Sequence, residues 1–85
     1  MIIFYLPAFV KSYRKLPADL RAEAKEKIEL FKKEPNHPFL KTHKLKGTLF
    51  GRFGFSVNYS HRIVFQYLSK TEVALLAIGT HEIYK

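Results

Sequence analysis

The sequence predicts a single α+β domain over residues 1–85, in which a small, mainly antiparallel sheet packs on a helical hairpin. Three observations favour this class. The chain opens with a β-branched and aromatic segment, and two stretches with helical spacing of apolar residues follow. The second half consists of alternating or apolar segments joined by short turns. The expected order of elements is therefore β-α-α-β-β-β.

Two helices are expected after a short first strand at residues 1–5. The first helix ends before Pro17, because proline disfavours the helical conformation of the residue that precedes it. Its apolar stripe consists of Phe9, Val10, Tyr13 and Leu16. The second helix runs from Pro17 to Lys33, and its apolar face consists of Leu20, Ala24, Ile28 and Phe31. The pair is predicted to form a helical hairpin above a Phe-rich core.

A basic connector is expected at residues 39–47, because Pro35 and Pro38 stop the second helix. Three of its side chains are expected to anchor it in the core: Phe39, Leu40 and Leu45. The stretch from 32 to 52 holds six basic residues and one acidic residue. Such a charge run is typical of a solvated loop, but it also suits contacts with phosphate groups.

Three strands are expected in the second half. Residues 49–59 alternate, and one face carries Leu49, Phe53, Phe55, Val57 and Tyr59. A tight turn at residues 59–61 precedes the next strand, and another at 69–72 precedes an apolar run at 73–78. That run has the composition of a strand buried on both faces. The short turns make these strands an antiparallel meander.

Arg62 stands out because it interrupts an otherwise apolar and aromatic stretch, residues 57–67. Burying its charged head without a partner costs several kcal/mol. Strand alternation places Arg62 on the face opposite Ile63 and Phe65. One face then packs in the core, while the other presents a fixed cation at its rim.

Composition narrows the class of protein. The chain has no cysteine, which excludes disulfides and thiolate metal sites, and it has no apolar run long enough to span a membrane. We therefore expect a soluble, cytoplasmic protein with no membrane contact. Its net charge of +8 favours a polyanion as partner, although an acidic protein or an anionic lipid would also fit.

Polar side chains near the end of the last strand suit metal-free proton transfer at a phosphate. His81 and Tyr84 follow the apolar run, and the turn before Arg62 contributes His61. Histidine titrates near neutrality and arginine stays charged, so one can move a proton while the other stabilises a pentavalent phosphorane. The four histidines show no metal-ligand spacing, so we expect no metal and no cofactor.

Each of these residues also has a purely structural interpretation. His81 can cap a strand end, and Tyr84 can be a core aromatic with its hydroxyl in solvent. Arg62 can pair with Glu72 or Glu82. The residues alone leave both interpretations open.

Four groups of residues extend over nearly the whole chain in a characteristic order. They are Phe9-Val10-Lys11 with Lys15-Leu16-Pro17, then His43-Lys44-Leu45-Lys46-Gly47, then Tyr59-Ser60-His61-Arg62-Ile63-Val64-Phe65, and finally Ile78-Gly79-Thr80-His81 with Tyr84. With these motifs the chain resembles toxins of the RelE/ParE superfamily, in particular the RelE/StbE and YoeB-like branch of bacterial type II toxin–antitoxin systems. The fold of that family agrees with the predicted order of elements.

The resemblance implies a metal-free, ribosome-dependent mRNA endonuclease (an mRNA interferase) that inhibits translation. Arg62 would hold the scissile phosphate, His81 would be the acid or base, and Tyr84 would assist or orient the RNA. His43 matches a catalytic histidine of YafQ-type relatives. YoeB-like toxins place a glutamate base in the connector, but residues 35–46 contain no acid, so His43 or His37 would act instead.

The expected RNA-binding residues are Lys41, Lys44, Lys46, Arg52 and His61. The expected partners are mRNA on the ribosome and a cognate antitoxin protein, with which the chain would form a toxin–antitoxin hetero-oligomer. Two alternatives stay open. A ParE-like member would inhibit DNA gyrase, and an inactive relative would only bind RNA or an antitoxin.

Overall fold

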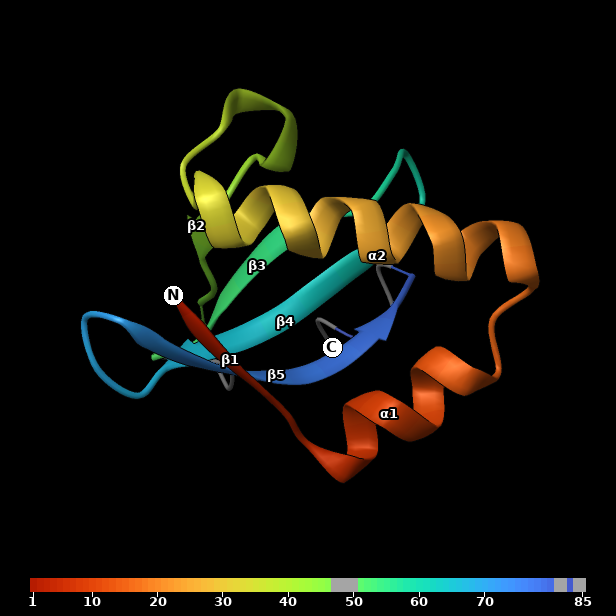
Figure 1. Cartoon of the computed structure of the whole chain (residues 1–85), viewed down its shortest axis with the longest axis horizontal. Helices are drawn as coiled ribbons and strands as arrows, with labels where there is room; N and C mark the ends of the chain where they lie inside the picture. The colour runs from red at the N-terminus through yellow and green to blue at the C-terminus, as the bar shows by residue number, and fades with distance from the viewer. Residues whose placement is uncertain (47–50, 81–82, 84–85) are drawn as a thin grey trace.

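The computed structural model describes residues 1–46, 51–80 and 83. Its elements are labelled in Figure 1. They follow one another as β1 (Ile2–Tyr5), α1 (Pro7–Arg14), α2 (Ala18–Lys33), the 3-10 turn η1 (Pro38–Leu40), β2 (His43–Lys44), β3 (Phe53–Ser56), β4 (Arg62–Tyr67) and β5 (Glu72–Gly79). The predicted α+β class and the helical hairpin ahead of the meander are confirmed.

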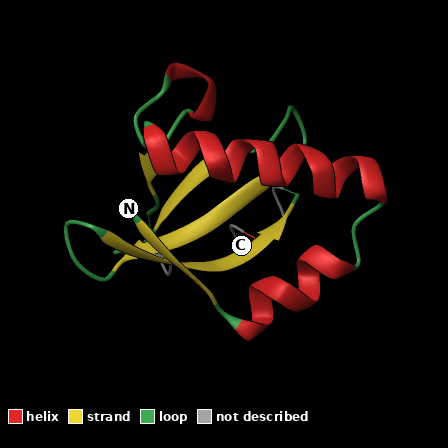
Figure 2. Ribbon diagram, in the orientation of Figure 1, coloured by secondary structure: helices red, strands yellow, loops and turns green. Residues whose placement is uncertain are grey.

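One sheet contains all five strands, in the order β1-β5-β4-β3-β2. β1 runs parallel to β5, and the other neighbouring strands are antiparallel. Figure 2 shows α2 running across the sheet and α1 lying beside the β1–β5 side. The sheet is therefore mainly antiparallel, as the sequence predicts.

The described sheet contains one strand more than the sequence predicts. His43 and Lys44 form β2, which pairs with Gly54 and Phe53 of β3. A two-residue strand of polar side chains has no hydrophobic period, so it forms only because β3 offers backbone partners. The strand predicted at residues 49–59 is also shorter, since β3 spans only Phe53–Ser56.

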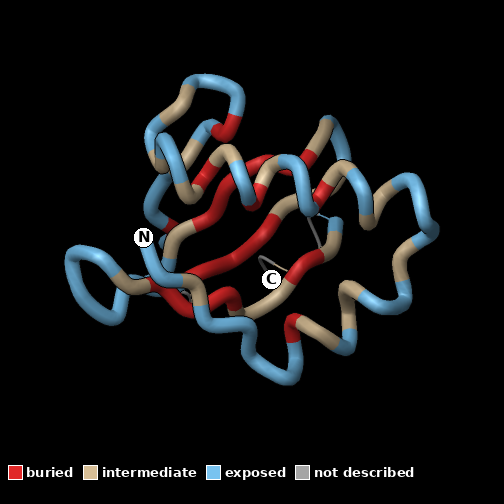
Figure 3. Tube along the Cα trace, viewed as in Figure 1, coloured by how far each residue is buried: buried red, intermediate tan, exposed pale blue. Residues whose placement is uncertain are grey.

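The core is Phe-rich, as predicted. The ring of Phe31 on α2 stacks on Phe55 at 4.6 Å between centroids and meets Phe65 edge-on at 4.7 Å. Figure 3 shows the buried residues concentrated along the central strands and at intervals along α2. Burying three aromatic rings against one another fixes α2 over β3 and β4.

Of the three predicted anchors in the connector, two are confirmed and one is wrong. Leu40 and Leu45 are buried, whereas Phe39 is 71% exposed. Within the short η1 turn, neighbouring side chains leave in different directions, so Leu40 enters the core and Phe39 faces solvent.

A β-bulge in β5 interrupts its pairing with β4. Val64 pairs with Ala77 but Phe65 pairs with Leu75, which leaves Leu76 as the extra residue. The prediction that this strand is buried on both faces is therefore only partly right, because Leu76 and Ala77 are half-buried.

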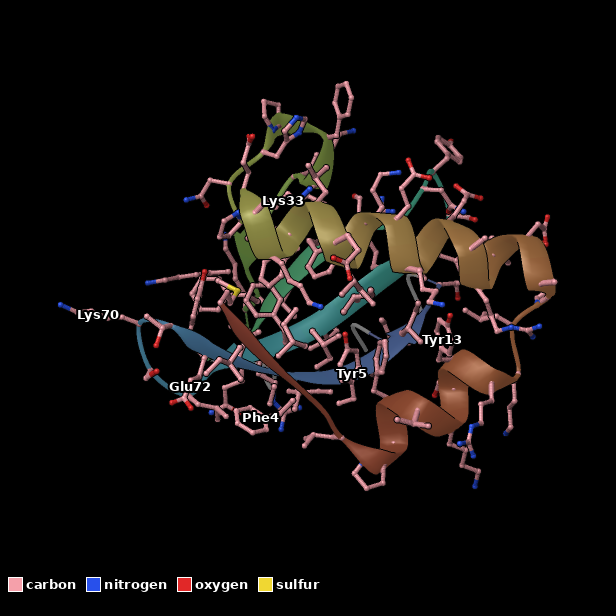
Figure 4. All side chains as sticks on the ribbon, viewed as in Figure 1. Phe4, Tyr5, Tyr13, Lys33, Lys70 and Glu72 are labelled. Carbon is pink, nitrogen blue, oxygen red and sulfur yellow. The ribbon has the colours of Figure 1, made fainter. Side chains whose placement is uncertain are left out.

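Polar contacts close the turn between the helices. Arg21 donates a hydrogen bond from Nη1 to the Leu16 carbonyl at 2.6 Å, and the Tyr13 hydroxyl donates to the Arg21 carbonyl at 3.3 Å. Figure 4 shows Tyr13 of α1 and Tyr5 of β1 on the inner side of α1.

In the part of the chain that the structure describes, no helix has the length and apolar character to cross a membrane.

Candidate functional site

The turn between β3 and β4 is built around the side chain of Asn58. Its Oδ1 accepts hydrogen bonds from the backbone amides of Ser60, at 2.9 Å, and His61, at 2.8 Å. Its Nδ2 donates to Oε1 of Glu23 on α2, at 3.3 Å. Asparagine favours such turns because its side chain mimics a backbone carbonyl. The turn is therefore closed locally and also fixed to α2.

Arg62, the first residue of β4, donates from Nη1 to backbone carbonyls of this turn. The acceptors are Asn58 at 2.7 Å, His61 at 3.1 Å and Tyr59 at 3.4 Å. Within residues 1–46, 51–80 and 83, no hydrogen bond uses Nε or Nη2 of Arg62. A guanidinium held through one nitrogen keeps its other N–H groups for the oxygens of an anion such as phosphate.

The structural interpretation in which Arg62 pairs with Glu72 is wrong. Glu72 begins β5, whereas Arg62 pairs with Gly79 at the other end of that strand. The Glu72 carboxylate instead accepts a hydrogen bond from the Ser69 hydroxyl at 3.0 Å. Glu82 lies outside the described residues. No described carboxylate therefore neutralises the Arg62 charge.

A groove of about 800 Å³ lies beside this turn. Its walls come from α2, the segment around η1, the β3–β4 turn and the end of β5; in Figure 1 the η1 segment and the β3–β4 turn rise on the same side of α2. The lining residues are Lys27, Pro38, Phe39, Lys41, Ser56, Val57, Asn58, Tyr59, Ser60, Arg62 and Thr80. The described lining thus contains three cations and no acidic side chain.

The local backbone positions the two lysines of the groove, Lys27 and Lys41. Lys27 lies one helical turn after Glu23, the residue that holds Asn58, so both side chains lie on the same face of α2. Lys41 ends η1 with a left-handed φ of 50°, which is uncommon for a residue with a Cβ. Among the described residues the one ion pair, Lys32 to Glu29 at 3.2 Å, lies outside the groove, and its hydrogen bond raises the pKa of Lys32.

The end of β5 approaches Arg62 directly. Arg62 pairs with Ser56 on one side and with Gly79 on the other. The Ile83 amide donates to the Thr80 carbonyl at 3.1 Å, and a Cβ on Gly79 would lie 2.6 Å from Cγ2 of Ile83. A side chain larger than hydrogen at this position would therefore have to displace Ile83. His81 and Tyr84, the predicted catalytic residues of this segment, lie outside the described residues.

The predicted RNA-binding residues fall into separate places. Lys41 lines the groove with Arg62. Lys44, Lys46 and Arg52 are exposed around the other end of β3, where the Leu45 amide donates to the Arg52 carbonyl at 2.9 Å. His61 is half-buried in the turn, with its Nδ1 2.8 Å from the Ser60 hydroxyl.

His43 shares a sheet face with Arg62 but does not line the groove. It pairs with Gly54, which pairs with Val64, two residues from Arg62 on β4. Strand spacing of ~4.8 Å and a rise of ~3.3 Å per residue put the Cα atoms of His43 and Arg62 roughly 12 Å apart.

Hydrogen bonds assign different tautomers to the two connector histidines. Nδ1 of His43 lies 2.9 Å from the Lys41 carbonyl, which only accepts, so Nδ1 carries the proton and the neutral ring has its lone pair on Nε2. Nδ1 of His37 instead accepts from the Phe39 amide at 3.1 Å, which places the proton of the neutral ring on Nε2.

Of the eleven lining residues only Lys41 and Arg62 were predicted as site residues, and the missed ones include a cation and two exposed aromatic rings: Lys27, Phe39 and Tyr59. Lys27 has the sequence context of an ordinary solvated helix position. Phe39 and Tyr59 have the apolar character of core residues, and only their exposure in the folded chain, 71% and 97%, distinguishes them.

The fold and groove define a small α+β domain with a basic concave site, and comparisons place it among known proteins. No family model and no curated protein matches the chain. Solved structures do match. A YoeB/ParE toxin from Agrobacterium tumefaciens is 19% identical, with a TM-score of 0.77 over 95% of this chain and 99% of that chain.

Two further matches have the same range of similarity. A chain of the toxin–antitoxin complex RelBE2 from Mycobacterium tuberculosis is 18% identical, with a TM-score of 0.78 over 94% of this chain and 96% of that chain. YafQ from E. coli is 20% identical, with a TM-score of 0.76 over 95% and 93%. The chain therefore has the fold of RelE/YoeB-like toxins, as the sequence resemblance predicts.

Proposed function

We propose that this protein is the toxin of a type II toxin–antitoxin system and acts as a metal-free endoribonuclease on mRNA bound to the ribosome. The observation that carries the proposal is the environment of Arg62. Its guanidinium is held by the β3–β4 turn, and Arg62 borders a groove together with Lys27, Lys41 and Thr80. A fixed cation in a basic concavity suits the phosphate of a polynucleotide.

The proposed reaction is attack by a ribose 2′-hydroxyl on the adjacent phosphate. A base removes the 2′ proton as the oxygen bonds to phosphorus, and Arg62 stabilises the charge of the pentavalent phosphorane. The bond from phosphorus to the 5′ oxygen then breaks, and an acid protonates that oxygen. The products are a 2′,3′-cyclic phosphate and a 5′-hydroxyl. His81 is proposed as acid or base, and Tyr84 as the residue that assists or orients the RNA.

His43 and His37 are the two connector candidates for the base, and their hydrogen bonds differ. A base needs a lone pair on the nitrogen that meets the substrate, and the neutral His43 ring has it on Nε2. The neutral His37 ring instead carries its proton on Nε2, because its Nδ1 accepts the Phe39 amide. Because the Cα atoms of His43 and Arg62 lie roughly 12 Å apart, both side chains must extend toward the same phosphate for His43 to act as the base.

Inducible expression in cells tests the activity. We expect growth arrest and new 5′-hydroxyl ends within translated messages, and we expect both to disappear in His81→Ala. Lys70→Ala, in the exposed β4–β5 turn, serves as the control. Arrest with intact messages and DNA breaks would favour the gyrase alternative, and a folded protein that causes neither would favour an inactive relative.

An antitoxin is proposed as the partner that restrains the toxin in the cytoplasm. Solved neighbours include two toxin–antitoxin complexes, RelBE2 from Mycobacterium tuberculosis and YoeB–YefM from Staphylococcus aureus. The +8 net charge of this chain suits an acidic segment that folds on binding. Co-expression with the adjacent open reading frame should give co-purification and relief of growth arrest, and a neighbour that does neither would contradict this part.

A further inference from the structure

Two aromatic side chains at the groove are more exposed than every other aromatic side chain that the structure describes. Tyr59 is 97% exposed and Phe39 is 71% exposed, and both line the groove that contains Arg62. The other large apolar side chains that are exposed in the described part of the chain lie outside the groove, at the N-terminal segment and near the β4–β5 turn: Met1, Ile2, Phe4, Tyr5, Leu6, Tyr67 and Leu68. Large rings exposed at a basic groove indicate a binding surface.

Both rings stand on backbone that is fixed. Tyr59 follows Asn58 in the closed turn, and its own carbonyl accepts from Nη1 of Arg62 at 3.4 Å. Phe39 lies in η1 beside Leu40, which is fully buried, and its ring meets His37 edge-on at 4.8 Å between centroids. The backbone that carries both rings is therefore ordered before a ligand arrives, which lowers the entropy cost of stacking.

The two rings stand on separate walls of the groove. Phe39 belongs to the segment after α2 and Tyr59 to the β3–β4 turn, with the cations of Lys41 and Arg62 in the same lining. Exposed rings combined with cations are the features by which proteins hold single-stranded nucleic acid, where bases stack on rings and phosphates meet cations. A duplex would not use the rings, because its bases are already stacked and paired.

We propose that Phe39 and Tyr59 form an aromatic pair that stacks the unpaired bases of single-stranded RNA flanking the phosphate held at Arg62. This inference rests on the proposed function, because it names how the RNA substrate of that site is held. Recognition is through base faces, so the pair orders the strand and tolerates many sequences. The phosphate contacts of Lys27 and Lys41 set its position along the groove.

Fluorescence anisotropy with the full chain tests the proposal. The probes are a labelled single-stranded 2′-O-methyl RNA, which cannot be cleaved, and an abasic strand of the same length and charge. Phe39→Ala and Tyr59→Ala should each weaken binding of the RNA by roughly 5- to 150-fold and leave binding of the abasic strand unchanged. Phe39→Tyr and Tyr59→Phe should retain the wild-type affinity.

Phe4→Ala is the matched control, since Phe4 is a 44% exposed ring on β1 outside the groove. It should bind both probes like the wild type. Equal losses for both probes in the ring variants, or no loss, would overturn the stacking pair. If Phe39→Ala and Tyr59→Ala weakened binding of polyglutamate as much as binding of RNA, the proposal would also be overturned, because the surface would then bind acidic protein segments.

The outcomes separate this inference from the proposed function. If RNA binding depends on Phe39 and Tyr59 but the protein cuts no message, the stacking proposal is supported and the proposed nuclease activity is contradicted. Message cleavage by a protein whose ring variants bind RNA normally, or whose wild type binds no RNA, contradicts the pair alone.

Discussion

The carbonyl oxygen of Asn58 accepts a 2.7 Å hydrogen bond from Nη1 of Arg62, and the side chain of the same asparagine closes the turn between them. One residue therefore fixes both the turn and the cation that borders the groove. Because Glu23 accepts from Nδ2 of Asn58, the arrangement is also tied to α2. The position of the charge is a property of the fold and not of a flexible side chain.

Asn58→Ala tests this dependence. The variant loses the acceptor for two backbone amides and the bond to Glu23. At about 0.5–1.5 kcal/mol net for each of these three hydrogen bonds, we expect a loss of roughly 1.5–4.5 kcal/mol in unfolding free energy, measured by urea denaturation. Glu23→Ala removes only the link to α2 and should cost less. An Asn58→Ala protein as stable as the wild type would show that the turn does not depend on this side chain.

Arg62→Lys tests whether geometry or charge matters at the proposed phosphate site. Lysine keeps the charge but lacks the planar fork of N–H donors. We expect Arg62→Lys and Arg62→Ala both to abolish growth arrest in folded protein, with a rate loss of about 10²- to 10³-fold, the usual effect of removing one transition-state donor. Circular dichroism confirms the fold. Full toxicity of Arg62→Lys would reduce the role of Arg62 to its charge.

A structural feature can be predicted from the sequence when it depends on its own residues and not on pairing with a distant segment. Helices and strands follow from periodicity, and the turn at residues 59–61 follows from its polar composition. β2 could not be predicted, because its strand character comes from pairing with β3 and not from its own residues. The β4–β5 bulge depends on pairing in the same way.

The candidate site shows the same division. The sequence indicates Arg62 because a charge within an apolar strand is conspicuous, and Lys41 because it belongs to a charge run. It does not separate Lys41 from Lys44, since only the left-handed turn at the end of η1 puts the former into the groove. Phe39 could not be distinguished from a core residue, because its exposure depends on how Leu40 packs.

Charge reversal distinguishes the groove from the rest of the basic connector. Lys41→Glu should weaken binding of RNA more than Lys44→Glu or Lys46→Glu, since only Lys41 lines the groove. The plot of log K against log salt should also become less steep, by roughly 0.7 for every phosphate of a single strand that is no longer neutralised. Binding is measured by anisotropy over a salt series. Equal effects of the three substitutions would indicate a diffuse basic surface.

Gly79→Ala tests the close approach of Ile83 to β5. The added Cβ would lie 2.6 Å from Cγ2 of Ile83, so the variant should be destabilised by about 1–3 kcal/mol, the typical cost of overpacking. Ile83→Ala removes the clashing atom. In the double variant the cost of Gly79→Ala should therefore fall, as seen by urea denaturation in a double-mutant cycle. Strictly additive effects would show that the two residues do not meet.

The most direct test of the account is a map of RNA ends from purified ribosomes that translate a defined message with and without the protein. The account predicts cleavage within the translated region, with 5′-hydroxyl and 2′,3′-cyclic phosphate ends. It also predicts that His81→Ala and Arg62→Ala abolish cleavage and that Lys70→Ala does not. Intact messages with folded wild-type protein, or equal cleavage by His81→Ala, would contradict it.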